Sequence, residues 1–339
     1  MTRALICHSV GPAVSIQDLG RAGTLALGLS RGGAADRIAV YESAALLGQP
    51  ASMALLEMAG LGGVFEATET MRIAVTGAPM KADIDGAPVI WNAVHTLAAG
   101  ARLTIGPTLS GSYGYLGVGG GFCVPEVLSA RSAHLVAGLG GVVGQGAQIP
   151  VGADTGHQTG LTLTPEPRFD GGDIRVTPSL QTDHFEKIDL ERFEKTEFHR
   201  DPRANRMGVK VIGTGDGFFA AGGLQVLSEV IVPGDIQVTG DGMPFVLLAE
   251  SQTTGGYPRI ATVIPPDLPK IAQAPAGSII RFRFISVADA VAVHRKAMED
   301  LRTLKTRVKP LVRDPRDIGN LAEFQLISGA TSGVFEEDT

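Results

Sequence analysis

Cysteine and aromatic residues are scarce in this 339-residue chain, which has two cysteines and an aromatic content of 5%. Cys7 and Cys123 form no metal-binding spacing, and a single pair does not indicate the disulfide framework of a secreted protein. The seven histidines never pair as H-x-H or H-E-x-x-H, the spacings typical of zinc sites. We therefore expect reduced thiols and no bound metal.

Long apolar runs and basic clusters are also missing. No window approaches the roughly 18 uninterrupted apolar residues of a membrane-spanning helix. The opening MTRALICHSVGP lacks the apolar core of a signal peptide. The formal net charge is −6, and no run of lysines and arginines would follow a phosphate backbone. The sequence predicts a cytoplasmic protein that binds neither membranes nor nucleic acid.

Two familiar catalytic or nucleotide motifs are absent or incomplete. No Gly-Lys dipeptide occurs, so the phosphate-binding loop with its lysine is missing. Gly28–Gly32 reads G-x-S-x-G, a motif that exposes a serine nucleophile between a strand and a helix. Gly33 and Ala34 separate this motif from the expected helix, and the chain lacks the βα alternation of a hydrolase sheet. A serine hydrolase is therefore disfavoured.

Glycine and proline are abundant, with 45 and 20 residues, which is typical of many short strands and turns. Good helix formers at 34–47 end at Gly48, and an apolar face recurs through 287–306. The prediction is a mainly β protein with a few helices. We expect an N-terminal β-rich lobe at 1–190 with one helix near 34–47, a C-terminal β-barrel lobe at 191–306 with a closing helix, and a tail at 307–339.

A polar, glycine-bent segment lies between the apolar runs 244–249 and 260–264, both of strand composition. Gln252, Thr253 and Thr254 can hydrogen-bond a ligand, and Tyr257 adds a rigid ring with a hydroxyl. Loops held on a rigid frame commonly carry binding sites. The alternative interpretation is a tight surface hairpin without a ligand.

Several charged residues stand in apolar or glycine-rich surroundings; they are Asp18, Arg21, Asp36, Glu57, Arg131 and Glu250. Ionisable groups in such surroundings usually pair with one another. They either form buried ion pairs that hold two lobes together, or they bind a small molecule that carries a carboxylate or an amide. The residues alone leave both possibilities open.

Three segments together resemble a known family. They are VGPAVSIQDLGRAG at 10–23, NRMG at 205–208, and GMPFVLLAESQTTGGYPRIATVIPPDLPKIAQ at 242–273. The chain resembles the carboxyltransferase subdomain family over about residues 8–285. That family includes the KipA-like proteins, the C subunit of 5-oxoprolinase (also named allophanate hydrolase subunit 2) and the carboxyltransferase part of urea amidolyase. The resemblance implies two cyclophilin-like β-barrel lobes.

The resemblance also implies a function. The favoured function is that of the C subunit of an ATP-dependent 5-oxoprolinase complex, which converts 5-oxoproline to glutamate. Its partners would be a KipI-like B subunit and an A subunit. One alternative is a biotin-dependent carboxyltransferase acting on urea or another amide. Met80-Lys81 lacks the flanks of a biotin-accepting motif, so carboxybiotin would arrive on another protein. A second alternative is a non-catalytic KipA-like regulatory subunit that binds a KipI-like partner.

The resemblance places the ligand, a small lactam or amide, between the two lobes. Asp18, Arg21 and Glu250 would be catalytic. The substrate-binding residues would be Gln17, Asp36, Arg131, Ser132, Asn205, Arg206, Gln252, Thr253, Thr254 and Tyr257.

The chain departs from the family pattern at a few of these places. Family members usually read G-V-P-x-S-G-A-M-D at 28–36 and G-S-R-S-T at 129–133, and they commonly have aspartate before Q-T-T-G-G-Y-P. Among the changed positions, this chain has Ser30, Gly32, Ala130, Ala133 and Glu250. The departures leave the identity of the substrate open.

Overall fold

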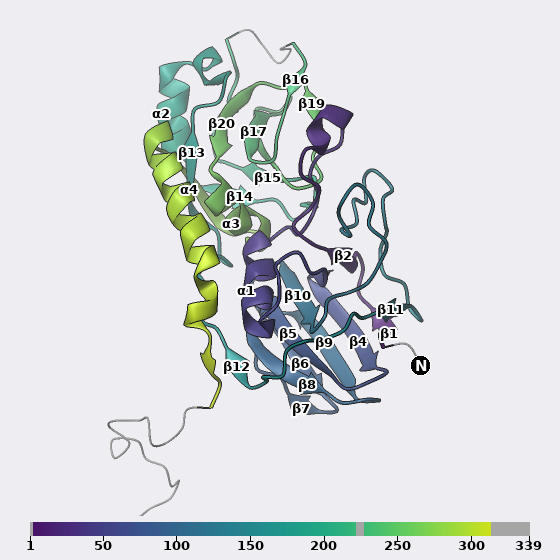
Figure 1. Ribbon diagram of the computed structural model, residues 1–339. Helices are drawn as coiled ribbons and strands as arrows, with labels where there is room; N and C mark the ends of the chain where they lie inside the picture. Colours follow the sequence, from purple (N-terminus) through teal and green to yellow (C-terminus); the bar gives the residue numbers. More distant parts are fainter. Residues whose placement is uncertain (1–2, 222–226, 313–339) are drawn as a thin grey trace, which may run out of the picture.

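Two β-rich lobes pack against each other in the computed structural model, which describes residues 3–221 and 227–312 (Figure 1). The first lobe contains two sheets, with strand orders β11-β1-β4-β9-β6-β7 and β2-β3-β10-β5-β8-β12-β22. The strands of this lobe that precede the second lobe in the chain are β1 Ala4–Val10, β2 Ser15–Gln17, β3 Leu55–Ala59, β4 Leu61–Ala67, β5 Met71–Gly77, β6 Met80–Ile84, β7 Ala87–Pro88, β8 Ala93–Leu97, β9 Arg102–Thr108, β10 Tyr113–Val118, β11 Gln148–Pro150 and β12 Leu161–Thr162.

The two sheets share one core, in which Leu5, Phe65, Ile73 and Leu116 are fully buried. Strands β5 and β10 are buried along both faces, because the core covers one face and helix α1 packs near the other. Asp85 and Gly86 form the two-residue hairpin turn between β6 and β7, with positive φ at both residues, as a primed turn requires.

Helix α1, Arg37–Leu47, confirms the helix predicted near 34–47. Asp36 begins it, because its side chain accepts hydrogen bonds from the backbone N–H groups of Ile38 and Ala39. Gly48 ends it with φ of 64°, the left-handed conformation that glycine tolerates best.

The second lobe is a closed barrel with strand order β13-β20-β17-β18-β15-β14-β21. Its strands are β13 Gly172–Thr177, β14 Phe198–Arg200, β15 Gly208–Ile212, β17 Asp235–Val238, β18 Pro244–Leu247, β20 Arg259–Val263 and β21 Ile279–Phe284; β16 Glu229–Val230 and β19 Thr254–Gly255 form a separate pair. The barrel begins ahead of the expected boundary between 190 and 191, because β13 pairs with β20 and β21. Rings of Phe193 and Phe282 stack in its core with centroids 4.8 Å apart.

Helices and short 3-10 turns complete the described chain. They are η1 Thr24–Leu27, η2 Thr182–His184, α2 Lys187–Lys195, η3 Pro265–Asp267, α3 Leu268–Gln273, α4 Val287–Arg302 and η4 Leu304–Arg307. The sequence did not predict α3, a single short helix after two prolines. Within the described residues, no helix has the length and apolar character needed to cross a membrane.

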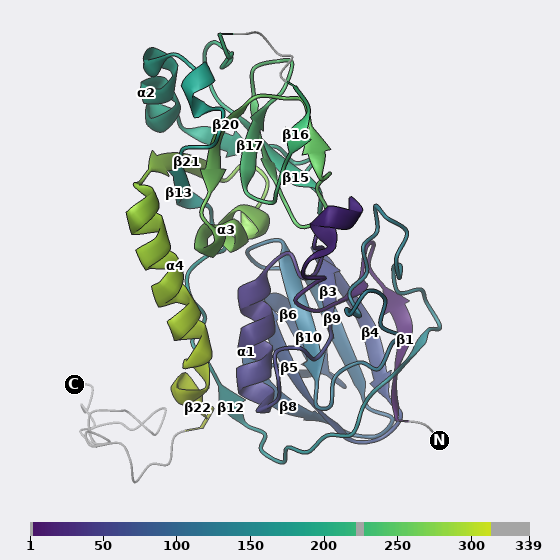
Figure 2. The ribbon, with the colours of Figure 1, turned by 45° about the horizontal axis from the view of Figure 1, so that its top comes forward.

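Helix α4 confirms the predicted closing helix and runs from the barrel along the first lobe (Figures 1 and 2). Beyond it, Leu304 inserts among Leu46, Leu47 and Leu163 of the first lobe. Strand β22, Lys309–Pro310, then pairs with β12. The start of the expected tail is therefore part of the first lobe, and residues 313–339 of that tail lie outside the described residues.

Replacing Leu304 with alanine tests this return of the chain. Leu304 is 5% exposed, so its removal leaves a cavity and should lower the free energy of unfolding by about 2–5 kcal/mol. Val312→Ala is the control, because that side chain is 81% exposed and its loss should change stability by less than about 0.5 kcal/mol. Urea titration of both variants measures the difference; equal stabilities would show that the segment after α4 contributes little.

Candidate functional site

A buried arginine joins the two lobes. Arg206, just before β15, donates from Nε to Glu250 Oε1 at 2.6 Å and from Nη1 to Glu57 Oε1 of β3. Its Nη2 donates to the carbonyl of Gly33 at 2.5 Å. All three side chains are buried. A cation from the second lobe is thus shared by a carboxylate from each lobe.

The charges of this cluster stabilise one another. Burial alone would lower the pKa of the Arg206 guanidinium, but Glu57 and Glu250 outweigh it and raise that pKa above its ordinary value. Glu57 Oε2 also accepts from the backbone N–H of Ala35 and from the hydroxyl of Tyr115, both at 2.8 Å. Glu57 therefore has its oxygens occupied and serves as a structural anchor for Arg206.

Glu250 lies near a buried histidine and serine, and the serine is that of the G-x-S-x-G motif. The Ser30 Oγ is 2.9 Å from His134 Nε2, and His134 Nδ1 is 4.0 Å from Glu250 Oε2. The backbone N–H of Ala137 donates to Nδ1, which places the ring proton of the neutral imidazole on Nε2. His134 therefore donates to Ser30 and does not accept its proton, so Ser30 is not activated as a nucleophile.

The surrounding backbone agrees with this conclusion. The motif follows η1, not a strand, and α1 begins only at Arg37. The strand–turn–helix arrangement that exposes a nucleophilic serine is therefore missing. The sequence-based judgement against a serine hydrolase stands on both grounds.

The buried His134 gives the fold a pH dependence. Burial lowers its pKa below the ordinary value; Glu250 opposes this effect, and Arg21 and Arg206 add to it. In the unfolded chain histidine titrates near pH 6.5. Below about that pH the unfolded state therefore binds a proton that the folded state binds only at lower pH. This contribution to stability is present above the unfolded pKa and is lost as the pH falls toward the folded pKa.

We expect the free energy of unfolding to decrease as the pH falls from about 7 to about 5. His134→Gln, whose amide can replace the Nε2–H donor, should flatten that slope. His199→Gln, at an exposed position, is the control and should leave it unchanged. Urea titrations across this range measure the slopes; an unaltered slope in His134→Gln would contradict the assignment.

Asp18 and Arg21 were expected, with Glu250, to be catalytic; in the structure both hold a neighbouring loop. Arg21 donates to the carbonyl of Val127 at 3.0 Å, to Ser132 Oγ at 3.1 Å and to the carbonyl of Ser132 at 2.6 Å. Asp18 Oδ2 accepts from the backbone N–H of Arg131 at 2.6 Å. Both side chains thus fasten the same loop, 127–132, to the segment after β2. Burial lowers the pKa of the Arg21 guanidinium, while Asp18 and Glu250 act in the opposite direction.

Two other expected residues are Arg131, within this loop, and Gln17, the last residue of β2. The Arg131 guanidinium pairs with Glu126 at 2.5 Å, and its enclosed Nε has no partner among the described residues. Gln17 is buried and donates to Ser15 Oγ at 2.9 Å, while its Oε1 has no partner within the same part of the chain.

Asp36 belongs to a different cluster. One of its oxygens caps α1, and the other accepts from Arg168 Nε at 2.7 Å and from Gln273 Nε2 at 2.8 Å. Arg168 also binds Glu42 at 2.7 Å. Asp36 therefore has no oxygen left for a ligand and, unlike the sequence-based expectation, holds α1 and α3 together.

The polar loop after Glu250 lies at the surface. Gln252, Thr254 and Tyr257 are exposed, Thr253 is half-buried, and Asn205 is exposed with its side chain closing a turn to Met207. Strand β19 of this loop pairs with β16, and the dark purple η1 lies beside that pair in both views (Figures 1 and 2). The expected site residues thus divide into a buried junction and an exposed loop next to it.

Sequence reasoning missed a further arginine at the junction. Arg200, the last residue of β14, is 9% exposed, yet its guanidinium makes no hydrogen bond or ion pair within residues 3–221 and 227–312. Burial lowers its pKa below the ordinary value. The available signal was strand alternation, because Phe198 points into the barrel and Arg200 follows two residues later on the same face.

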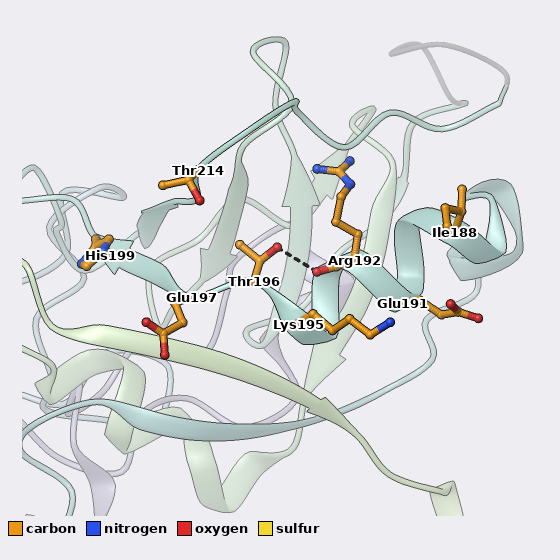
Figure 3. Close-up of a pocket in the computed structure, with 8 residues that line it drawn as sticks. All are labelled: Ile188, Glu191, Arg192, Lys195, Thr196, Glu197, His199 and Thr214. Atoms are coloured by element: carbon orange, nitrogen blue, oxygen red, sulfur yellow. Dashed lines mark hydrogen bonds between the residues drawn. The ribbon is translucent and has the colours of Figure 1, made fainter.

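A surface hollow of about 520 Å³ lies elsewhere, at α2 and β14 (Figure 3). Its lining includes Glu191, Lys195, Glu197 and His199, and none of the expected site residues. The Arg192 side chain points away from the other charged groups and stacks on Phe218 at 3.9 Å. Within the described residues, no group of three or more His, Cys, Asp or Glu side chains is placed to hold a metal ion.

The closed barrel, the two-sheet lobe and the charged junction between them define a two-lobed protein of the carboxyltransferase type. Residues 27–284 match the family described as carboxyltransferase domain, subdomain A and B, and the chain belongs to this family.

Similar proteins agree with this assignment. The 5-oxoprolinase C subunit of Haemophilus influenzae is 34% identical over 287 residues, which cover 83% of this chain and 91% of that relative. The protein in the crystal structure of TTHA0988 has 29% sequence identity to this chain, and the two structures superpose with a TM-score of 0.77. The match covers 83% of this chain and 56% of that one. The urea carboxylase of Kluyveromyces lactis shares the fold, with a TM-score of 0.81 at 22% identity over 93% of this chain and 31% of the other.

Proposed function

We propose that this chain is the C subunit of an ATP-dependent 5-oxoprolinase complex. The observation that carries the proposal is the 34% identity to a 5-oxoprolinase C subunit, along 91% of its length. In the proposed reaction water opens the lactam of 5-oxoproline to give glutamate, and a second water converts ATP to ADP and phosphate. A KipI-like B subunit, together with an A subunit, would complete the complex, which would act in the cytoplasm.

ATP would be held by another subunit. The N-terminus of α1 is capped by the Asp36 carboxylate, which disfavours a phosphate there, and that of α4 is capped by Ser286. The sequence also lacks the lysine-bearing phosphate loop. We therefore place ATP on another subunit, and what this chain would contribute is a site for the lactam.

The junction between the lobes is the proposed location of that site. Arg206 and Glu250 fix the start of the loop that carries Gln252, Thr253, Thr254 and Tyr257. The amide and hydroxyl groups of this loop are suited to the lactam N–H and carbonyl, because they can both donate and accept. Arg21, with Asp18, would position the facing loop, which contains Arg131 and Ser132.

The test is 5-oxoproline-dependent ADP release in a mixture of this chain with the A and B subunits, compared with the same mixture lacking it. We expect ADP and glutamate in equal amounts only when all three are present. If an assembled complex shows no dependence on this chain, the proposal is wrong.

The same assay separates the alternatives. Avidin should not inhibit the proposed reaction, because no biotin takes part. Inhibition by avidin, with urea or another amide as the better substrate, would instead indicate carboxyl transfer from a biotinylated partner. Binding of the KipI-like partner without any effect on turnover would indicate a regulatory subunit.

A further inference from the structure

The arginines expected to bind a substrate carboxylate are already occupied. Arg206 is shared by Glu57 and Glu250, and Arg21 donates to backbone carbonyls and to Ser132. Arg131 pairs with Glu126. A ligand carboxylate would have to displace these partners from Arg206 and Arg21. Arg131 keeps an unpartnered Nε, but Glu126 already balances its charge.

Arg200 differs from all of them. It is 9% exposed, its Nε is enclosed, and its guanidinium has no partner anywhere in the described chain. The neighbouring carboxylate, Asp201, is bound instead to Arg203 at 2.8 Å. Asp201 opposes the effect of burial on Arg200 but does not outweigh it, since the pKa of the guanidinium stays below its ordinary value. An anionic ligand hydrogen-bonded to Arg200 would offset the remaining cost of burying this cation.

The position of Arg200 is fixed by the segment that also holds Tyr113. The backbone N–H of Arg200 donates to the carbonyl of Ser278 at 3.0 Å, and Gly277 donates back to Arg200 at 2.9 Å. A few residues earlier, the side chain of Gln273 accepts from the backbone N–H of Tyr113 at 2.9 Å. The end of α3 and the following turn thus bring the end of β14 and the start of β10 together across the lobe junction.

Tyr113 supplies a second available donor. Tyr113 is 6% exposed, and its hydrogen bonds within residues 3–221 and 227–312 are all made by its backbone, which leaves the hydroxyl free to donate. Burial, followed by the charge of Glu57, raises the pKa of the phenol to about 12. Tyr113 is therefore neutral and can donate to an anion, while the nearby Arg200 acts in the direction that favours negative charge at this place.

We propose that Arg200, together with the Tyr113 hydroxyl, binds the carboxylate of the small-molecule substrate at the lobe junction. The planar guanidinium presents two parallel N–H groups to the carboxylate oxygens, and the phenol donates a third hydrogen bond. The identity of the ligand, 5-oxoproline, rests on the proposed function.

Arg200→Met is the test variant, since methionine replaces the cation with an apolar side chain of similar length. Titration calorimetry of the full chain should show that the variant binds 5-oxoproline about 10- to 100-fold more weakly. Pyrrolidin-2-one, which has the lactam but no carboxylate, should bind the wild type and the variant alike. Tyr113→Phe should weaken 5-oxoproline binding less, and Arg200→Lys should retain part of it.

The stability of the variant is a second measurement, which distinguishes a ligand-binding arginine from a purely structural one. Because the buried charge has no partner, Arg200→Met should unfold at the same urea concentration as the wild type or at a higher one. Arg102→Met is the control, because the Arg102 side chain is 60% exposed and pairs with Glu66 at 3.5 Å, and it should keep wild-type binding. A destabilised Arg200→Met that binds 5-oxoproline as the wild type does would overturn the inference.

The outcomes separate this inference from the proposed function. In the assembled complex, Arg200→Met should raise the KM for 5-oxoproline more than it lowers kcat. A complex that requires this chain but whose KM is unchanged by Arg200→Met would refute the role of Arg200 and leave the proposed function standing. If turnover does not require this chain, the proposed function fails. The carboxylate site is then tested separately, by comparing the affinities of the isolated chain for 5-oxoproline and for pyrrolidin-2-one. A wild-type chain that binds both compounds equally would refute it.

Discussion

Arg206→Met is expected to lower the free energy of unfolding by about 3–5 kcal/mol, the largest effect of any single change in the junction. The substitution leaves Glu57 and Glu250, both buried, without the cation that they share. Two uncompensated carboxylates then have to remain ionised in a poorly solvated place or take up protons. Urea unfolding of the isolated chain measures the loss.

The control for this prediction is a pair at the surface. Arg281→Met removes the partner of Glu197, and both of those side chains are partly exposed, so its cost should stay below about 1 kcal/mol. A triple variant, Glu57→Gln with Arg206→Met and Glu250→Gln, should recover much of the stability because it removes all three charges. If Arg206→Met costs no more than Arg281→Met, the cluster does not hold the lobes together.

Arg21→Ala is expected to reduce 5-oxoproline-dependent ADP release by the assembled complex about 100-fold, while the chain remains folded. The side chain makes three hydrogen bonds that fasten Val127 and Ser132. Without them the loop can shift relative to Glu250, to which the backbone N–H of Val136 is bound at 3.2 Å. Displacement of positioning groups by about 1 Å can account for a loss of this size.

Arg102→Ala is the control for Arg21→Ala, because the Arg102 side chain is mostly exposed and distant in sequence from every expected site residue. It should retain the activity of the wild type. Circular dichroism and a urea titration show whether Arg21→Ala is folded. A folded Arg21→Ala variant with full turnover would show that Arg21 does not position the site.

Local features of the fold were readable from the sequence because they depend on neighbouring residues. The Asp36 cap and Gly48 bound the first helix, and Asp85-Gly86 specifies a two-residue turn. Helix α3 was missed because its six residues are too short for a helical period to show. The start of the barrel was placed too late because β13 is defined by pairing with strands far along the chain.

The site was harder to predict, because its contacts join residues that are distant in sequence. Glu57 and Arg206 are 149 positions apart, and no local pattern indicates that they meet. Composition did indicate which charges would be buried, but not which would pair, so Asp36 was expected at the ligand and caps a helix instead. Arg200 was missed for the opposite reason, since the absence of a partner becomes visible only when all neighbours are in place.

In the mechanism proposed here, this chain holds 5-oxoproline at the junction of its two lobes. The most direct measurement is amide hydrogen exchange of the assembled complex with and without 5-oxoproline. We expect slower exchange at 127–136 and 250–257 when the ligand is present, and no change at 187–197 beside the surface hollow. Protection confined to 187–197, or no protection in this chain while the complex turns over its substrate, would contradict the proposed binding site.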